Sequence, residues 1–265
     1  MNAIGSRSLV AKNLSRFKLI TFDVTDTLLR FSRPPEVQYA MAARRFGFKD
    51  VNENGLARSF RPNFRRMAKE YPNFGKSSSR DWHWWWRTLV MDIFRDSHRH
   101  MDEPMLERIA SQLIEDYKTR ECWTKIELAD QVIRLARENC RQVGIISNFD
   151  PRLGEIVSDM RLPQVDFILT SYEAGASKPS PEIFAQALDR CRGTVSPSEA
   201  LHIGNTPKLD YVGARNAGWS SVLVNVDVDV EEEMEISQNG KVNSGHVFRN
   251  FADFISVLET VEFKW

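Results

Sequence analysis

The fold is decided by one stretch of sequence, Lys18-Leu19-Ile20-Thr21-Phe22-Asp23-Val24-Thr25-Asp26-Thr27-Leu28-Leu29. Its apolar, β-rich first half ends abruptly at a carboxylate, and small polar residues follow. This order is typical of a buried parallel strand followed by a turn. We therefore predict that Asp23 lies at the carboxyl edge of a parallel sheet, which is the edge where open α/β sheets bind ligands.

Later segments repeat this pattern of a short apolar strand that ends in a small or polar residue. They are residues 142–147, 166–171, 200–204 and 221–224. Helical segments of about a dozen residues separate them, and such an alternation favours a doubly wound parallel sheet. The sequence thus predicts the α/β class.

Residues 34–118 differ in character, because they contain four helical segments and few strand-like runs. We predict a flexible tail at 1–16, an α/β core at 17–32 and 120–265, and an inserted helical lid, or cap, at 33–119. Most of the tryptophans at 82 and 84–86 are expected to fill the core of the insert, the alternative being stacking on a nucleotide or sugar. The many arginines of 44–66 predict a solvated helix face, the alternative being that one or two of them hold an anionic group.

Composition excludes several classes of function. Lys and Arg total 36 and so do Asp and Glu, which predicts no nucleic-acid partner. The sequence has no apolar run of membrane-spanning length, so no membrane segment is expected. Three widely spaced cysteines indicate reduced thiols and an intracellular, by default cytoplasmic, protein, while the basic first residues leave a mitochondrial transit peptide as the alternative. An acidic run at 227–235 predicts a surface loop.

Three further motifs follow the first strand in order. Ser147-Asn148 ends the second strand, Lys178 stands in Lys-Pro-Ser-Pro-Glu-Ile-Phe, and Gly204-Asn205-Thr206-Pro207-Lys208-Leu209-Asp210 follows a later strand. Together with Asp-x-x-x-Thr-Leu at residues 23–28, they resemble the four motifs of the haloacid dehalogenase superfamily. Within it, the chain is most similar to the subgroup of the rhythmically expressed gene 2 and haloacid dehalogenase-like hydrolase domain-containing proteins.

The resemblance implies a Rossmann-like core with a helical cap and Mg²⁺-dependent hydrolysis of a small phosphorylated metabolite through an aspartyl-phosphate. It makes Asp23 the nucleophile and Lys178 the neutralising cation, an electrostatic role suited to phosphoryl transfer. The implied site residues are catalytic Asp23, Thr25, Ser147 and Lys178; phosphate-binding Thr27, Ser147, Asn148 and Lys178; and the magnesium ligands Asp23, Thr25 through its carbonyl, Asn205 and Asp210.

Two positions depart from the family pattern. Thr25 stands where phosphatases of this superfamily have a general acid–base Asp, a group of a kind that contributes about 10²–10⁴-fold to rate. Asn205 replaces the first Asp of the fourth motif, which weakens the expected affinity for Mg²⁺. The leading hypothesis is a weakened or specialised phosphatase. The alternatives are a catalytically silent protein that binds a phosphorylated ligand or a protein, and a 2-haloacid dehalogenase, which also lacks the second Asp.

Overall fold

The computed structural model describes residues 9–98, 100–225 and 242–265. The chain divides into two compact units. The α/β unit comprises the chain up to Arg30 together with Lys125–Asn148 and Leu162–Trp265, and the helical unit comprises Phe31–Thr124 and Phe149–Arg161. The 227–235 loop prediction lies outside the described residues.

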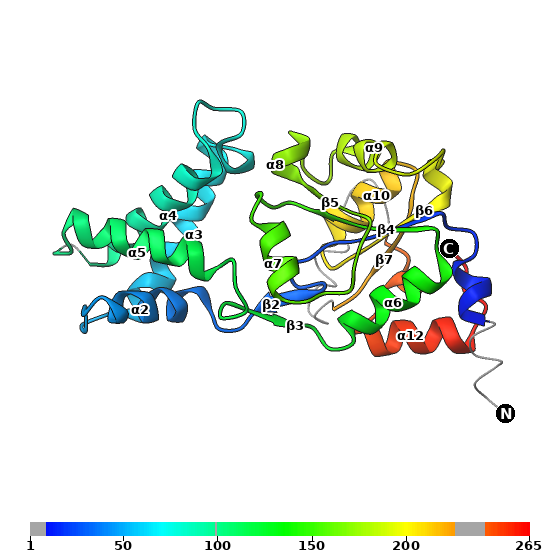
Figure 1. The fold of residues 1–265 in the computed structure, drawn as a ribbon, viewed down its shortest axis with the longest axis horizontal. Coiled ribbons are helices and arrows are strands. Elements are labelled where there is room, and N and C mark those ends of the chain that lie inside the picture. The colour runs from blue at the N-terminus through cyan, green and yellow to red at the C-terminus, as the bar shows by residue number, and fades with distance from the viewer. Residues whose placement is uncertain (1–8, 99, 226–241) are drawn as a thin grey trace. The chain divides into compact units, whose positions relative to one another are not determined.

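A five-stranded parallel sheet forms the centre of the α/β unit (Figure 1). Its strand order is β5 (Phe167–Thr170), β4 (Gln142–Ser147), β1 (Leu19–Phe22), β6 (Ala200–Gly204) and β7 (Ser220–Leu223). All four residues of β1 are buried, and Phe22 aligns with Ile145 on one side and with Ile203 on the other. The predicted α/β class with a parallel sheet is confirmed, and β1 is its central strand.

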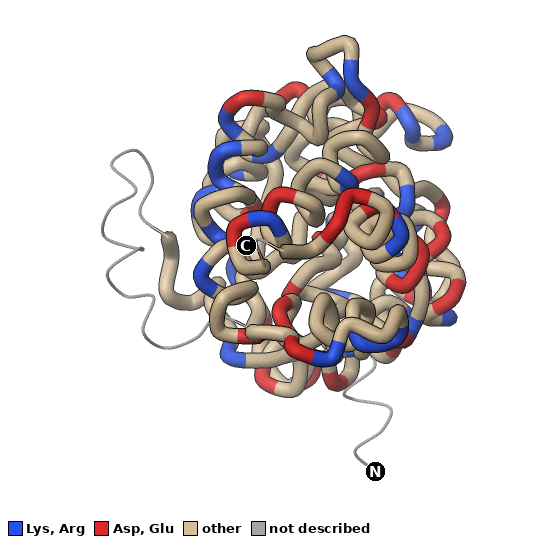
Figure 2. Tube along the Cα trace, turned by 90° about the vertical axis from the view of Figure 1, so that its left-hand side faces the viewer, with Lys and Arg blue, Asp and Glu red and all other residues tan. Residues whose placement is uncertain are grey.

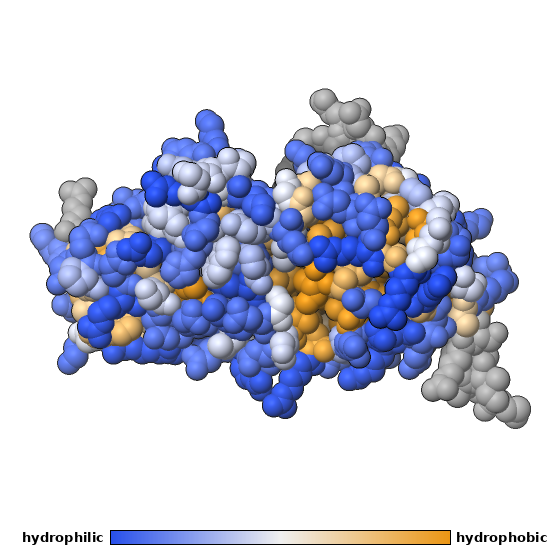
Figure 3. Space-filling view, turned by 45° about the horizontal axis from the view of Figure 1, so that its top comes forward, coloured by the Kyte–Doolittle hydropathy of each residue, from blue (hydrophilic) through white to orange (hydrophobic). Residues whose placement is uncertain are grey.

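Helices cover both faces of this sheet (Figure 1). α6 (Ala129–Asn139) and α12 (Phe251–Thr260) lie on one face, and α9 (Pro181–Asp189) and α10 (Gly213–Asn216) on the other. Shorter elements complete the unit: α8 (Ser171–Ala174), η2 (Pro197–Glu199), η3 (Pro207–Val212) and η5 (Ser244–His246). Figure 3 shows that hydrophobic residues reach the surface mainly over this unit on the face in view.

The N-terminal segment is not a free tail up to residue 16. Residues 9–14 are helical, with Val10 and Leu14 buried. The Asn13 side chain donates to the carbonyls of Leu258 (2.9 Å) and Val261 (2.7 Å), so it fastens this helical segment to the C-terminal end of the chain. The predicted flexible tail is therefore wrong for residues 9–16, and residues 1–8 lie outside the described part of the chain.

The helical unit contains four main helices, α2 (Pro35–Arg45), α3 (Glu53–Glu70), α4 (Trp82–Ser97) and α5 (Glu103–Asp116), with the short η1 (Asn73–Gly75) between α3 and α4. Asp81 caps α4 by accepting a hydrogen bond from the Trp84 amide at 2.7 Å. β2 (Leu29–Phe31) and β3 (Trp123–Lys125) pair in a two-stranded ribbon at the two ends of the segment Phe31–Thr124. None of the described helices combines the length and apolar character needed to cross a membrane.

One boundary differs from the sequence-based division. Phe149–Arg161, which includes α7 (Leu153–Asp159), belongs to the helical unit rather than to the α/β core. The reason is packing, because the Phe149 ring lies 6.1 Å from the Trp123 ring and the Trp86 indole donates to Asp150 at 2.7 Å.

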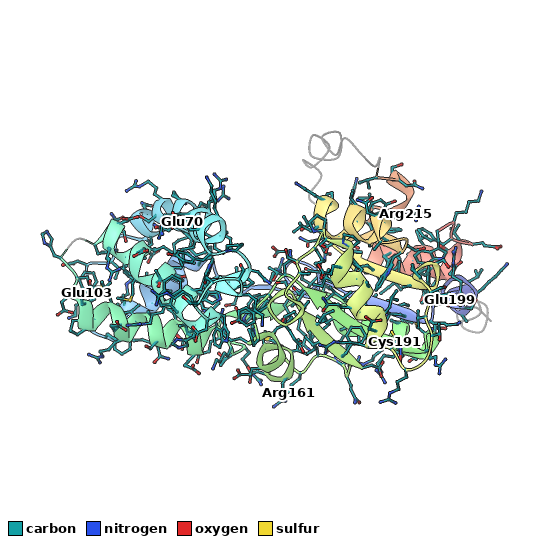
Figure 4. All side chains as sticks on the ribbon, turned by 90° about the horizontal axis from the view of Figure 1, so that it is seen from above. Glu70, Glu103, Arg161, Cys191, Glu199 and Arg215 are labelled. Atoms are coloured by element: carbon teal, nitrogen blue, oxygen red, sulfur yellow. The ribbon has the colours of Figure 1, made fainter. Side chains whose placement is uncertain are left out.

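The tryptophans and arginines of the helical unit have mainly structural contacts. Trp85 is buried and its indole donates to the Tyr71 carbonyl at 2.9 Å, while Trp84 and Trp86 pack partly buried against the same core. Arginines pair with neighbouring acids, as Arg66 does with Glu70 and Arg95 with Glu103, both acids being labelled in Figure 4. Basic and acidic segments are accordingly interspersed in Figure 2.

Candidate active site

Asp23 follows the last residue of β1 and is nearly buried, with 7% of its surface exposed. Its Oδ1 atom accepts hydrogen bonds from Lys178 Nζ at 2.7 Å and from Ser147 Oγ at 3.0 Å. Among the described residues, its Oδ2 atom receives only a long contact from Thr27 Oγ1, at 3.4 Å. One carboxylate oxygen is therefore held in place while the other keeps free lone pairs.

The turn after Asp23 explains why the neighbouring acid does not enter the site. Asp26 has a φ of +58°, a left-handed conformation that Asp tolerates better than most residues, and it is exposed. Its carbonyl and that of Thr27 both accept hydrogen bonds from the Asn225 side chain, at 3.2 and 3.0 Å. Thr25 is half-buried in the same turn.

Lys178 binds three acceptors from a nearly fully buried position. Besides Asp23, its Nζ atom donates to Asp210 Oδ1 at 2.6 Å and to the Ile146 carbonyl at 3.0 Å. Asn148 holds the Lys178 backbone from both sides, since its Nδ2 donates to the Lys178 carbonyl (2.9 Å) and its Oδ1 accepts from the Lys178 amide (2.8 Å). The observed contacts of Asn148 thus position Lys178, and a phosphate contact by its side chain stays a prediction.

Each carboxylate oxygen of Asp210, a residue of η3, takes part in two hydrogen bonds. Oδ1 bonds with Lys178 and with His202 Nε2 (3.1 Å), and Oδ2 accepts the amides of Asn205 (3.1 Å) and Thr206 (2.8 Å). A Cβ atom on Gly204 would lie 2.3 Å from Asp210 Cγ, so only glycine permits this approach. Asp210 is therefore built into the wall of the site as the partner of Lys178.

His202 is a site residue that the sequence analysis missed. It lies in β6 opposite Thr21 of β1, and its Nδ1 atom is 2.8 Å from the Thr21 hydroxyl. Its other ring nitrogen reaches Asp210, so the neutral tautomer that donates from Nε2 satisfies both contacts. A single histidine inside an apolar strand has no motif around it, and only the strand pairing brings it to Asp210.

Burial and charge set the protonation of the cluster. Burial raises the pKa of Asp23, and the opposing charge of Lys178 offsets part of that rise. Burial acts in the same direction on Asp210, but Lys178 and the hydrogen bond with His202 hold the pKa of that carboxyl below its usual value. Burial alone lowers the pKa of Lys178, yet the two carboxylates raise it, and burial lowers the pKa of His202. At neutral pH we expect a charged lysine beside a neutral histidine.

The oxygen atoms near Asp23 fit a weakly held magnesium ion. Thr27 Oγ1 lies 3.4 Å from Asp23 Oδ2 and 3.3 Å from Asn205 Oδ1, so a carboxylate oxygen and an amide oxygen flank the same hydroxyl. Two such oxygens suit an ion that takes one or two carboxylates and keeps several waters. The described residues contain no group of three or more His, Cys, Asp or Glu that could hold a metal. Asp210 could become a direct ligand only by giving up a hydrogen bond.

The structure therefore joins most of the predicted site residues in one hydrogen-bonded cluster: Asp23, Thr27, Ser147, Asn148, Lys178, Asn205 and Asp210. Thr25 lies beside the cluster in the chain, and none of the described contacts links its side chain to it. All of these residues belong to the α/β unit.

Comparisons with known proteins identify the family of the chain. A family model described as haloacid dehalogenase-like hydrolase matches residues 17–218. The Rhythmically expressed gene 2 protein of Drosophila melanogaster is 38% identical over 264 residues, which cover 96% of this chain and 100% of that protein. The Haloacid dehalogenase-like hydrolase domain-containing protein 3 of Bos taurus is 36% identical over 210 residues, covering 79% of this chain and 82% of the relative.

Solved structures share the fold at lower identity. The putative HAD-hydrolase YfnB from Bacillus subtilis, solved bound to magnesium, matches with a TM-score of 0.62 and 18% identity. The match covers 92% of this chain and 99% of YfnB. It supports the Rossmann-like fold and carries no information on the substrate.

Proposed function

We propose a phosphatase activity for this chain, which belongs to the haloacid dehalogenase-like hydrolase family. The proposed reaction is the hydrolysis of a phosphate monoester of a small metabolite through an aspartyl-phosphate on Asp23. The observation that carries the proposal is the asymmetry of the Asp23 carboxylate. One oxygen is fixed by Lys178 and Ser147, and the other keeps the lone pairs that a nucleophile needs.

In the first step, an Asp23 oxygen attacks phosphorus and the bond between phosphorus and the ester oxygen breaks. The leaving oxygen takes the electron pair, and the phosphoryl group stays on Asp23. Lys178 is placed to neutralise the added charge, because its ammonium group already lies 2.7 Å from Asp23 Oδ1. The hydroxyls of Ser147 and Thr27, which already donate to Asp23, are candidates to donate to phosphoryl oxygens.

In the second step, water attacks phosphorus and the acyl-phosphate bond breaks, which releases inorganic phosphate and restores the Asp23 carboxylate. The proton of the attacking water passes to solvent or phosphate. Thr25 cannot supply the acid–base catalysis that a carboxyl group at its position would give, a contribution of about 10²–10⁴-fold. The exposed, left-handed Asp26 is a poor substitute.

Asp23, Asn205 and the Thr25 carbonyl would hold Mg²⁺, with Asp210 behind them. A bound magnesium ion would supply charge stabilisation to the phosphoryl oxygens. With one directly available carboxylate, we expect weak binding. Asn205→Asp adds a second carboxylate and should lower the Mg²⁺ concentration for half-maximal phosphate release by about tenfold, while Asn205→Ser should raise it.

The second candidate is a catalytically silent protein that binds a phosphorylated ligand or a protein. The substitutions at Thr25 and Asn205 favour it, since they remove two acids of the family pattern. A dehalogenase is less well supported. The Ser147-Asn148 pair is compatible with it, but the Asn148 side chain is occupied by the Lys178 backbone.

The test is phosphate release by the purified chain from a panel of phosphorylated metabolites with Mg²⁺. Asp23→Asn provides the blank, and Asp26→Asn is the matched control, because it makes the same change three residues away at an exposed position. We expect release that Asp23→Asn abolishes and Asp26→Asn retains. Wild-type release no faster than the blank would reject the phosphatase, and retained ligand binding by Asp23→Asn would then favour the silent protein. Halide release from a 2-haloacid in chelator would identify a dehalogenase.

A further inference from the structure

His202 is a buried polar side chain that the proposed steps of phosphoryl transfer do not use. It is fully buried in β6, a strand in which the other four residues are buried as well. A histidine at such a position costs desolvation free energy that a leucine would not, unless hydrogen bonds to both ring nitrogens offset that cost. A polar ring in this strand therefore points to a task for its hydrogen bonds.

Three contacts fix the orientation of the His202 ring. Its Nδ1 atom lies 2.8 Å from the Thr21 hydroxyl of β1, and its Nε2 atom lies 3.1 Å from Asp210 Oδ1. The Phe184 ring of α9 packs edge-to-face against it, with the ring centres 5.5 Å apart. Because an ionised carboxylate only accepts, the ring hydrogen lies on Nε2, and the Thr21 hydroxyl donates to Nδ1. The sheet and α9 together aim one N–H group at Asp210.

The two donors to Asp210 Oδ1 differ in stiffness. Lys178 Nζ donates at 2.6 Å from the end of a flexible four-carbon chain, whereas His202 Nε2 belongs to a ring held in the sheet. The other oxygen, Oδ2, accepts the backbone amides of Asn205 and Thr206. Within the described part of the chain, His202 is therefore the donor that fixes the oxygen in contact with Lys178.

The contact between Asp210 and Lys178 matters most when Asp23 carries the phosphoryl group. In the present structure, Lys178 Nζ is shared between Asp23 Oδ1 (2.7 Å) and Asp210 Oδ1 (2.6 Å). Formation of an aspartyl-phosphate turns the Asp23 carboxylate into an uncharged acyl group, so Asp210 is then the carboxylate that still holds the ammonium. A displaced ammonium would neutralise the phosphoryl group less well, and a displacement of about 1 Å can cost about 10²-fold in rate.

We propose that His202 is a positioning residue, which fixes Asp210 and thereby keeps the Lys178 ammonium in place throughout the reaction. The catalytic half of this role rests on the proposed function, whereas the effect on the position of Lys178 is independent of it. Ser221 of β7 supports the same arrangement. Its hydroxyl lies 3.1 Å from the His202 carbonyl and 3.4 Å from the Asp210 carbonyl, so it ties the two backbones together.

Substitutions can separate the hydrogen bond of His202 from its packing. Glutamine and methionine have similar shapes, and the amide nitrogen of glutamine stands about as far from Cβ as Nε2 does. His202→Gln therefore keeps a donor for Asp210, and His202→Met removes it. Leu201→Met is the matched control, because Leu201 is the neighbouring residue of the same buried strand and points to the opposite face of the sheet. Urea denaturation of each variant measures any loss of stability.

The position of Lys178 is measured without catalysis, by NMR of ¹⁵N-labelled lysine ammonium groups in the whole chain. The Lys178 signal is the one that disappears in Lys178→Arg. We expect its hydrogen exchange with water to be slow in the wild type, in His202→Gln and in Leu201→Met, and about tenfold faster in His202→Met, the equivalent of one hydrogen bond. If His202→Met does not fold, His202→Asn replaces it, since the shorter amide reaches Thr21 but not Asp210. Exchange as slow without the donor as in the wild type, or as fast in His202→Gln as in His202→Met, would overturn the proposal.

The catalytic half is tested by phosphate release from phenyl phosphate with Mg²⁺. We expect His202→Met to lower kcat by about tenfold or more at unchanged KM, and His202→Gln to stay within about threefold of the wild type. An unchanged kcat, or a raised KM alone, would overturn the catalytic role while the phosphatase stands. If the wild type releases phosphate from no ester, the proposed phosphatase fails, and the exchange rates of the Lys178 ammonium alone decide whether His202 positions it.

Discussion

The two units of the chain use buried charged groups differently. In the α/β unit, Asp210 accepts four hydrogen bonds and Lys178 Nζ donates three, one of them to Asp23. In the helical unit, the buried Asp150 accepts hydrogen bonds from Arg152 and from the Trp86 indole. The first network fixes the geometry of the candidate reacting groups, whereas the second joins α4 to the segment before α7.

Both units nevertheless contain a buried ion pair. Lys178 lies between the carboxylates of Asp23 and Asp210 in one unit, and Arg152 binds Asp150 in the other. Removing one partner of such a pair leaves an uncompensated buried charge and costs about 3–5 kcal/mol, even where the intact pair adds little stability. The predictions below compare the two.

Lys178→Met should have the largest effect. It leaves Asp23 and Asp210 facing each other without a cation, so we expect it to abolish phosphate release and to lower the free energy of unfolding by about 3–5 kcal/mol. Urea denaturation at pH 7 measures the loss. Lys18→Met, which breaks a half-exposed pair with Glu199, is the control and should change stability far less.

A second substitution shows whether charge is the cause of that loss. Lys178→Met/Asp210→Asn removes one of the two facing carboxylates and should regain part of the stability. A double variant as unstable as Lys178→Met alone would mean that lost packing of the lysine, not charge repulsion, destabilises the α/β unit.

Arg152→Met should have a somewhat smaller effect, near the lower limit of about 3 kcal/mol. Asp150 keeps two donors after this change, the Trp86 indole and the backbone amide of residue 152. The matched control is Arg120→Met, because Arg120 forms an exposed pair with Asp159 in the same unit. Equal unfolding curves for the two variants would show that the Arg152 pair is not a structural requirement of the helical unit.

Thr25→Asp tests the candidate active site of the α/β unit through its effect on kcat. Restoring an acid should raise kcat for an alkyl ester such as cyclohexyl phosphate by about 10²-fold and should change phenyl phosphate much less, because a phenolate leaves without protonation. Thr25→Asn is the control, since asparagine has nearly the shape of aspartic acid but cannot transfer a proton. A gain of equal size on both esters would contradict a role for residue 25 in protonating the leaving group.

Sequence reasoning reached the α/β site more fully than the packing of the helical unit. Asp23, Ser147, Lys178 and Asp210 each follow a strand or stand in a motif, and parallel pairing brings strand ends together, so their meeting was predictable. His202 was missed because its role depends on the register of β6 against β1.

The long-range contacts of the helical unit left almost no signal in the sequence. Phe149–Arg161 lies with the helical unit because Asp150 accepts a hydrogen bond from Trp86, a residue 64 positions away. Patterns along the chain report local structure and miss contacts of this kind.

The smallest predicted effect concerns pH and compares one histidine from each unit, chosen away from the candidate active site. Burial lowers the pKa of His98 in the helical unit and of His246 in the α/β unit. Each is neutral when folded but gains a proton when unfolded at pH below about 6.5, so the unfolded chain binds more protons and stability falls as pH decreases from 7 to 5. His98 Nε2 accepts the Asn52 amide at 2.9 Å, an interaction that protonation removes. Urea denaturation between pH 7 and 5 should show that the free energy of unfolding depends less on pH in His98→Gln and in His246→Gln than in the wild type. Each substitution should reduce the proton uptake on unfolding by less than one proton.

If the two units unfold in separate transitions, each substitution should weaken the pH dependence of the transition of its own unit alone. A change in both transitions would show that the units unfold together.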